Sequence, residues 1–208
     1  MMKIVQIAGY LGSGKTTLII DVAKRLAGQG VKIAILVNDI GAVPVDGAVM
    51  QEYGLTVKDI GGGCICCQVV GSLMTTLDNL AKGVHPDMVI IEPTGIAVPE
   101  SIRQTVLMAN KKRAITMELG HTIVLFDTSR AEKLLTYDTL KRLVTTQVKD
   151  ATIVVLSKAD LVTGRDIEAS VQAVRAINAS AEIIPVSTIS GSGIALLMDR
   201  IQNVVVPV

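Results

Sequence analysis

Residues 9–16 complete the pattern GxxxxGK[ST] with the sequence Gly9-Tyr10-Leu11-Gly12-Ser13-Gly14-Lys15-Thr16. An apolar run over residues 4–8 precedes this octapeptide and an amphipathic stretch over 16–27 follows it, which is the strand–loop–helix context that the pattern requires. Glycines let successive backbone N–H groups turn toward a phosphate, and the helix N-terminus adds its positive end. The pattern therefore predicts a nucleotide-binding loop (P-loop). We expect phosphate contacts from Gly12, Ser13, Gly14, Lys15, Thr16 and Thr17.

Outward from this loop, short aliphatic runs alternate with longer amphipathic stretches. Strands are predicted near residues 4–8, 32–37, 55–59, 88–92, 122–127, 153–157 and 183–186. Helices are predicted near 16–27, 69–82, 99–109, 130–146, 165–178 and 193–204. The alternation predicts an α/β protein with a mostly parallel central sheet flanked by helices, the P-loop NTPase fold. Because no repeat or linker divides the chain, residues 1–208 are predicted to form a single domain.

The composition excludes several classes of function. Hydrophobic residues make up 50% of the chain but aromatic residues only 2%, and the formal net charge is +1, so neither a basic surface nor a base-stacking platform for nucleic acid is expected. The apolar runs are much shorter than the roughly 18 residues of a membrane span. Three cysteines, all within residues 64–67, cannot form an ordinary disulfide framework. We expect a cytoplasmic protein that binds neither nucleic acid nor membranes.

Glu92 ends the apolar run 88–91, at the end of a strand where ligands collect in open α/β sheets. We predict that Glu92 and the hydroxyl of Thr16 hold Mg²⁺, and that Gly95 brings a backbone N–H to the γ-phosphate. A simpler interpretation of Glu92 is a strand-end carboxylate that faces water.

Asp39 follows the strand predicted at 32–37 and begins a long segment without a regular pattern. It is a second candidate for Mg²⁺ or for the attacking water, although an aspartate here could simply turn the chain. The predicted catalytic residues are Lys15, Asp39 and Glu92.

Residues 157–160 read Ser157-Lys158-Ala159-Asp160 directly after a predicted strand, which is the arrangement of a guanine-reading [NTS]KxD element. The carboxylate of Asp160 would accept two hydrogen bonds from guanine, a donor pair that adenine lacks. Lys158 would lay its aliphatic stem over the base, and Ser187 could add a backbone N–H. Asn is usual in place of Ser157; serine is too short both to reach the base and to brace the phosphate loop.

Cys64, Cys66 and Cys67 follow three glycines in the stretch GGGCICC. Three close thiolates favour Zn²⁺, Cu(I) or another thiophilic ion, and three ligands leave a fourth position open. A redox-active thiol cluster and inert packing remain alternatives. His85 and His121 are each predicted to be surface or capping residues rather than ligands.

The chain resembles the CobW-like GTPases, which are relatives of the nickel-insertion GTPases UreG and HypB. The resemblance rests on five stretches that occur in the order seen in that family: GYLGSGKTT, Asn38-Asp39, GGGCICC, IIEPTG and LSKAD. The resemblance covers most of the chain and includes only their nucleotide-binding domain, since CobW-like proteins typically continue into a second domain. At residues 38–42 this chain reads NDIGA where the family usually has NEFGE, so Ala42 replaces a second acid.

The resemblance implies a metallochaperone or metal-insertion GTPase with slow, Mg²⁺-dependent hydrolysis, a nucleotide-dependent homodimer and a metalloprotein or cofactor-enzyme client. It also implies that the CxCC cysteines bind metal and that nucleotide state gates its release. Two other interpretations stay open. One is an ATP-dependent kinase or ligase of a small molecule with Asp39 as base, which the 157–160 element opposes. The other is a metal- or redox-sensing module that binds nucleotide without useful turnover.

Overall fold

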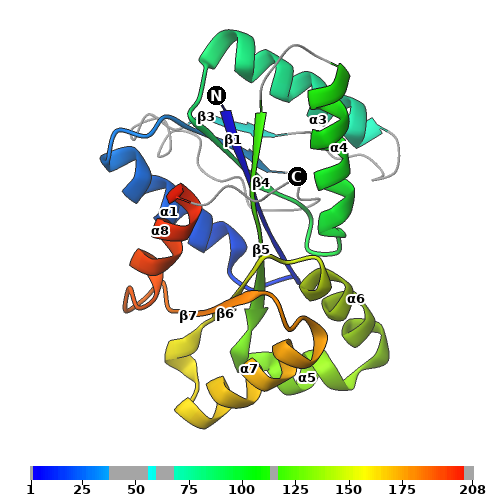
Figure 1. The fold of residues 1–208 in the computed structure, drawn as a ribbon. Helices are drawn as coiled ribbons and strands as arrows, with labels where there is room; N and C mark the ends of the chain where they lie inside the picture. The colour runs from blue at the N-terminus through cyan, green and yellow to red at the C-terminus, as the bar shows by residue number, and fades with distance from the viewer. Residues whose placement is uncertain (1, 38–55, 60–67, 113–116, 204–208) are drawn as a thin grey trace.

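The centre of the molecule is a seven-stranded sheet in the order β3-β2-β4-β1-β5-β6-β7, and every neighbouring pair of strands is parallel (Figure 1). In this computed structural model, the described residues are 2–37, 56–59, 68–112 and 117–203. The strands are β1 Met2–Gly9, β2 Ile33–Val37, β3 Thr56–Asp59, β4 Met88–Glu92, β5 Met117–Asp127, β6 Ile153–Ser157 and β7 Glu182–Val186.

Helices cover both faces of the sheet (Figure 1). They are α1 Lys15–Gly28, α3 Gln68–Asn79, α4 Pro99–Lys112, α5 Ala131–Thr136, α6 Asp138–Lys149, α7 Gly164–Ile177 and α8 Ile194–Asn203. Three short turns complete the described elements: the π-helical η1 Leu80–Val84 and the 3₁₀ turns η2 Thr128–Arg130 and η3 Ala159–Leu161. The predicted α/β fold with a parallel sheet flanked by helices is confirmed. Within the described residues, no helix has the length and apolar character needed to cross a bilayer.

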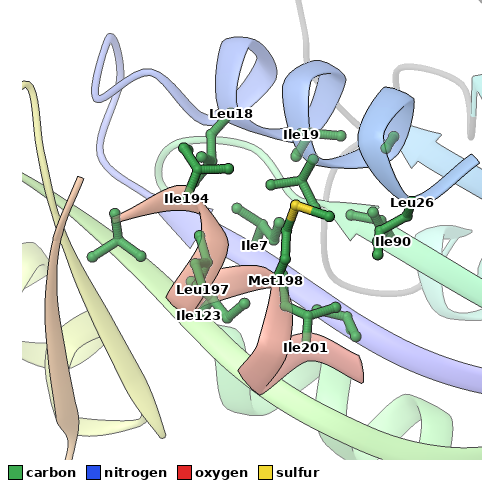
Figure 2. Packing of buried hydrophobic residues seen from close by; sticks show 14 of the residues in the cluster. Ile7, Leu18, Ile19, Leu26, Ile90, Ile123, Ile194, Leu197, Met198 and Ile201 are labelled. Atoms are coloured by element: carbon green, nitrogen blue, oxygen red, sulfur yellow. The ribbon is translucent and has the colours of Figure 1, made fainter. Parts of the chain in front are cut away.

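Alternate strand residues build separate cores on the two faces. Val5 and Ile7 of β1 face α1 and α8, which bring Leu18 and Leu197 to the same cluster (Figure 2). Ile4, one position along, packs instead in the cluster that includes α3 and α4. Because strands of this sheet are buried on both faces, their sequences are continuous apolar runs and not alternating ones. Each fully buried Leu or Ile contributes roughly 1.5–3 kcal/mol to folding.

The prediction of a single helix over residues 130–146 is wrong. The chain forms η2 and α5, breaks at Tyr137, and starts again as α6. Tyr137 is extended (φ −79°, ψ 118°) and 58% exposed. The break occurs where Thr136, Tyr137 and Asp138 follow one another, all residues of modest helix propensity. Asp138 then places a carboxylate in the first turn of α6, where the helix dipole favours it.

The strand predicted at 122–127 begins five residues earlier, at Met117. Its register against β1 shifts between Ile4 and Gln6, where β5 carries an extra residue near Gly120. A Cβ on Gly120 would lie 3.0 Å from Val5 Cγ2, so glycine permits this close approach of the two strands. Because glycine usually indicates the end of a strand, the prediction missed the first half of β5.

Candidate functional site

The carboxyl ends of the strands meet along one edge of the sheet. Glu92 aligns with Val37 across β4 and β2, and Asp127 aligns with Ser157 across β5 and β6. Gly9, the last residue of β1, aligns with Leu125 of β5. In open parallel sheets ligands bind outside this edge, and the predicted site residues collect there.

Three glycines shape the loop between β1 and α1. Gly9, Gly12 and Gly14 have φ values of 141°, 72° and 94°, in the left-handed region that favours glycine. Gly9 is constrained twice, because a Cβ there would lie 2.6 Å from the carbonyl oxygen of Leu125. Gly14 immediately precedes α1. The loop therefore has the backbone geometry with which P-loops turn N–H groups toward a phosphate.

Lys15 and Thr16 open α1 at the centre of this edge. Lys15 is only 5% exposed, and its Nζ lies 3.4 Å from the carbonyl oxygen of Tyr10. The hydroxyl of Thr16 donates to Glu92 Oε1 at 2.7 Å, and Glu92 is 1% exposed. Hydroxyl and carboxylate oxygens are ligands that Mg²⁺ accepts. The two side chains therefore fit the ion predicted between them.

The loop after β4 packs directly on the phosphate loop. A Cβ on Gly95 would lie 2.6 Å from Leu11 Cδ2, so only glycine allows this contact. Gln147 of α6, which is 1% exposed, donates through Nε2 to the carbonyl oxygens of Gly95 (3.1 Å) and Ala97 (2.9 Å). Sequence reasoning missed Gln147. Its sole sequence signal was a polar residue on the buried face of an amphipathic helix.

The 157–160 element lies at the end of β6, beside the phosphate loop. Ser157 Oγ donates to the carbonyl oxygen of Ser13 at 2.8 Å. Serine at this position therefore braces the phosphate loop. Asp160, the predicted base-reading residue, lies in η3. Lys158 adopts a left-handed conformation (φ 58°) between the strand and η3.

A cavity of about 340 Å³ opens between the phosphate loop and this element. It is lined by Ser13, Gly14, Thr17, Leu18, Leu125, Val155, Ser157, Lys158, Asp160, Leu161, Val186, Thr188 and Ile189. Apolar walls with one carboxylate at the side suit a flat heterocycle that presents N–H donors.

Ser187 does not line this cavity. Its N–H donates to the carbonyl oxygen of Ser192 (3.1 Å), and its hydroxyl accepts from the N–H groups of Ile189 and Ser190. Ser187 thus shapes the turn that places Thr188 and Ile189 on the cavity wall.

Asp127, at the end of β5, is a second residue that sequence reasoning missed. The carboxylate is fully buried; Oδ2 accepts from Arg130 Nε (2.7 Å) and Lys158 Nζ (2.8 Å), while Oδ1 accepts from Ser129. Burial by itself raises the pKa of Asp127. The hydrogen bonds from Lys158, Ser129 and Arg130 outweigh burial, so the pKa lies below its ordinary value and the carboxylate stays charged.

Several predicted site residues lie outside the described part of the chain. These are Asp39, Cys64, Cys66 and Cys67. Within the described ranges, no group of three or more His, Cys, Asp or Glu side chains is arranged to hold a metal ion.

The two histidines differ. His85 is exposed and ends η1 in a left-handed conformation, with its N–H donating to the carbonyl oxygen of Leu80, so the capping prediction is confirmed. For His121 the surface or capping prediction is wrong. It is 7% exposed within β5, and its Nδ1 lies 2.9 Å from Thr152 Oγ1.

The family described as CobW/HypB/UreG, nucleotide-binding domain, matches residues 3–185. The zinc chaperone YeiR of Escherichia coli (strain K12) is 41% identical over 96 residues, which are 46% of this chain and 29% of YeiR. The zinc chaperone YjiA of the same strain is 32% identical over 160 residues, 74% of this chain and 48% of YjiA. The chain thus spans less than half the length of these two relatives.

Solved structures agree with this match. The Zn(II)-bound YjiA GTPase from E. coli superposes with a TM-score of 0.61 at 27% identity, covering 88% of this chain and 56% of YjiA. The hydrogenase maturation factor HypB from Archaeoglobus fulgidus superposes with a TM-score of 0.64 over 95% of this chain and 87% of HypB. At 21% identity, the likeness to HypB concerns the fold alone.

Proposed function

Because the chain belongs to the CobW/HypB/UreG nucleotide-binding-domain family, we propose that it is a slow, Mg²⁺-dependent GTPase that serves as a metallochaperone. Its nucleotide state controls the capture and release of Zn²⁺ or another thiophilic ion at Cys64, Cys66 and Cys67. The recipient is a client metalloprotein or cofactor-dependent enzyme.

The observation that carries GTP binding is the cavity beside the phosphate loop. It brings Asp160 and Lys158 next to Gly14, so a nucleotide whose phosphates lie on the loop would place its base against this carboxylate. Guanine offers Asp160 two N–H donors, whereas adenine would leave the carboxylate desolvated and unpaired, which disfavours it strongly.

The hydrolytic centre that we propose consists of Lys15, Thr16, Glu92 and Asp39. Lys15 binds the terminal phosphates, Thr16 and Glu92 hold Mg²⁺, and Asp39 holds the ion or the attacking water. The bound ion would neutralise developing phosphate charge. The residues after Gly95 are Ile96, Ala97 and Val98, so no glutamine follows to orient the water, and we expect slow intrinsic turnover.

Metal handling is proposed from donor chemistry. Three thiols within residues 64–67 supply the soft ligands that Zn²⁺ prefers and leave one position open for transfer. The names of the relatives YeiR and YjiA, both zinc chaperones, support zinc as the cargo.

We also propose a nucleotide-dependent homodimer that forms across the phosphate edge. Leu11, Ile96 and Val98 are 46%, 55% and 38% exposed, and Leu11 contacts the loop that carries the other two. Nucleotide bound on the phosphate loop would complete a shared apolar surface.

The test is a binding and hydrolysis series on the full chain, purified without chelators. GTP and ATP are titrated with Mg²⁺, with and without one equivalent of Zn²⁺, Co²⁺ or Ni²⁺. We expect GTP to bind at least about a hundredfold more tightly than ATP and one metal to shift affinity or hydrolysis. A Cys64→Ser/Cys66→Ser/Cys67→Ser variant should lose that shift and keep basal hydrolysis.

His85→Asn is the matched control, because it removes an exposed imidazole, a side chain able to bind metal, that the proposal does not use, at a left-handed position that asparagine tolerates. It should retain the metal effect. A preference for ATP without any metal effect would contradict the proposed function and direct the search to small-molecule phosphate acceptors.

A further inference from the structure

Arg130 joins the end of β5 to the outside of the phosphate loop. Its Nε donates to Asp127 Oδ2 at 2.7 Å, and its Nη2 donates to the carbonyl oxygen of Leu11 at 2.9 Å. The guanidinium also lies against Gly12, where a Cβ would be 3.4 Å from Nη2. One planar group thus contacts a buried carboxylate and two consecutive residues of the loop.

The peptide between Leu11 and Gly12 is planar and trans, so its C=O and N–H point in opposite directions. A donor that holds the Leu11 carbonyl outward therefore directs the N–H of Gly12 to the other side. Ser157 holds the Ser13–Gly14 peptide in the same way, by donating to the carbonyl oxygen of Ser13. Two carbonyls of the loop are thereby held by side chains, and the N–H of Ser13 between them donates to the carbonyl oxygen of Tyr10 at 3.2 Å. These contacts fix the loop and direct the N–H of Gly12 toward the anion-binding concavity.

The position of Arg130 is itself fixed. The buried carboxylate of Asp127 is held by the N–H and hydroxyl of Ser129 on one oxygen and by two cations on the other. Lys158, the second of these cations, belongs to the element that lines the base cavity. Asp127 therefore connects the phosphate loop to the base cavity through one oxygen.

We propose that Arg130, anchored by Asp127, is a positioning residue that presets the Leu11–Gly12 peptide for the β- and γ-phosphates of the nucleotide. The role rests on the proposed nucleotide site but not on the identity of the base. Loss of Arg130 should weaken the binding of nucleotides that have a β-phosphate in the loop more than the binding of nucleotides that lack one. Recognition of the base should not change.

The test compares Arg130→Gln and Arg130→Lys with the wild type. Affinities for GDP and GMP are measured with Mg²⁺, together with the melting temperature of each protein without nucleotide. We expect Arg130→Gln to lower the affinity for GDP about tenfold, as the loss of a charge-assisted hydrogen bond would, with the affinity for GMP within about twofold of wild type.

Arg130→Lys separates positioning from folding. A lysine can keep the ion pair with Asp127, but its single ammonium lacks the planar fork that reaches both partners. This variant should keep the wild-type melting temperature. The ratio of its affinity for GDP to its affinity for GMP should nevertheless fall well below the wild-type ratio. Arg25→Gln is the control for loss of an arginine, because Arg25 also donates through Nε to a carboxylate, Asp21 at 2.9 Å, but on the exposed surface near the far end of α1. It should leave the ratio unchanged.

A wild-type GDP-to-GMP ratio in Arg130→Lys, or equal losses for GDP and GMP in Arg130→Gln, would overturn the proposal. If the wild type binds adenine nucleotides in preference, the proposed function fails, and the same comparison with ADP and AMP still decides the role of Arg130.

Discussion

His121 makes the stability of the protein depend on pH. Burial lowers its pKa; Glu182 acts in the opposite direction, and Lys3 and Arg200 lower it further. The folded state therefore keeps the imidazole neutral, while the unfolded chain takes up a proton near pH 6.5. We expect the free energy of unfolding to fall as the pH drops from about 7.5 to about 5.5, and His121→Gln to flatten this decline. Urea unfolding of the wild type and of His121→Gln at both pH values measures this decline. Equal declines in the two proteins would contradict its assignment to His121.

The side chains proposed to bind nucleotide and Mg²⁺ were named from the sequence alone, whereas the side chains that hold the surrounding loops were not. Lys15, Thr16 and Glu92 stand at fixed positions in short patterns, because phosphate and Mg²⁺ chemistry demands those groups. Arg130 and Gln147 bind backbone carbonyls that are distant in sequence. Because every residue has a backbone carbonyl, the sequence does not indicate which one a side chain will bind. Such contacts become visible only once the fold places the two segments together.

Among the elements, α6 stabilises the loop after β4 through Gln147. Gln147→Met keeps the volume but leaves the carbonyls of Gly95 and Ala97 without this donor. We expect a loss of about 1–3 kcal/mol in the free energy of unfolding, the usual cost of unsatisfied buried polar groups. Chemical denaturation measures the loss.

Gln104→Met provides the comparison for this prediction, since Gln104 lies on the exposed side of α4. It should change stability by no more than about 0.5 kcal/mol. Equal effects of the two substitutions would show that the contacts of Gln147 to the loop contribute nothing particular.

Element boundaries were predictable where hydrophobicity alone decides them. β4 and β6 are buried on both faces and have the same bounds in sequence and structure. Where a local irregularity intervenes, the pattern misleads: Gly120 conceals the first half of β5, and Tyr137 divides a stretch whose periodicity suggested one helix. The first depends on the close approach of β5 to β1 at Gly120, and the second on three successive residues of modest helix propensity, whose effect hydrophobic periodicity does not register.

For the molecule as a whole, the proposed dimer makes a sharp prediction. With Mg²⁺ and a non-hydrolysable GTP analogue, sedimentation should show a dimer, and without nucleotide a monomer. Ile96→Asp should abolish dimerisation, because it introduces a charge into the apolar surface at the phosphate edge. Leu196→Asp, a similarly exposed position on α8, should leave it intact. Loss of the dimer in both variants, or in neither, would contradict an interface at this edge.

The parallel sheet could be predicted from alternating strands and helices, but its strand order could not. The sequence does not say that β1 lies between β4 and β5, because that order depends on which crossovers bury the most surface. The order matters, since it brings Asp127 of β5 beside the phosphate loop that leaves β1.

The central place of β1 also has a consequence for how the chain is made. β1 leaves the ribosome before either of its two partners, β4 and β5, and the latter ends only at Asp127. Until β5 has been synthesised, the apolar strand β1 and the loop behind it lack one or both of the strands that flank β1 in the fold. Nascent chains expose such segments to aggregation and to holdase chaperones. The cavity beside the phosphate loop is thus completed only after Ser157 and the turn beyond β7 have emerged.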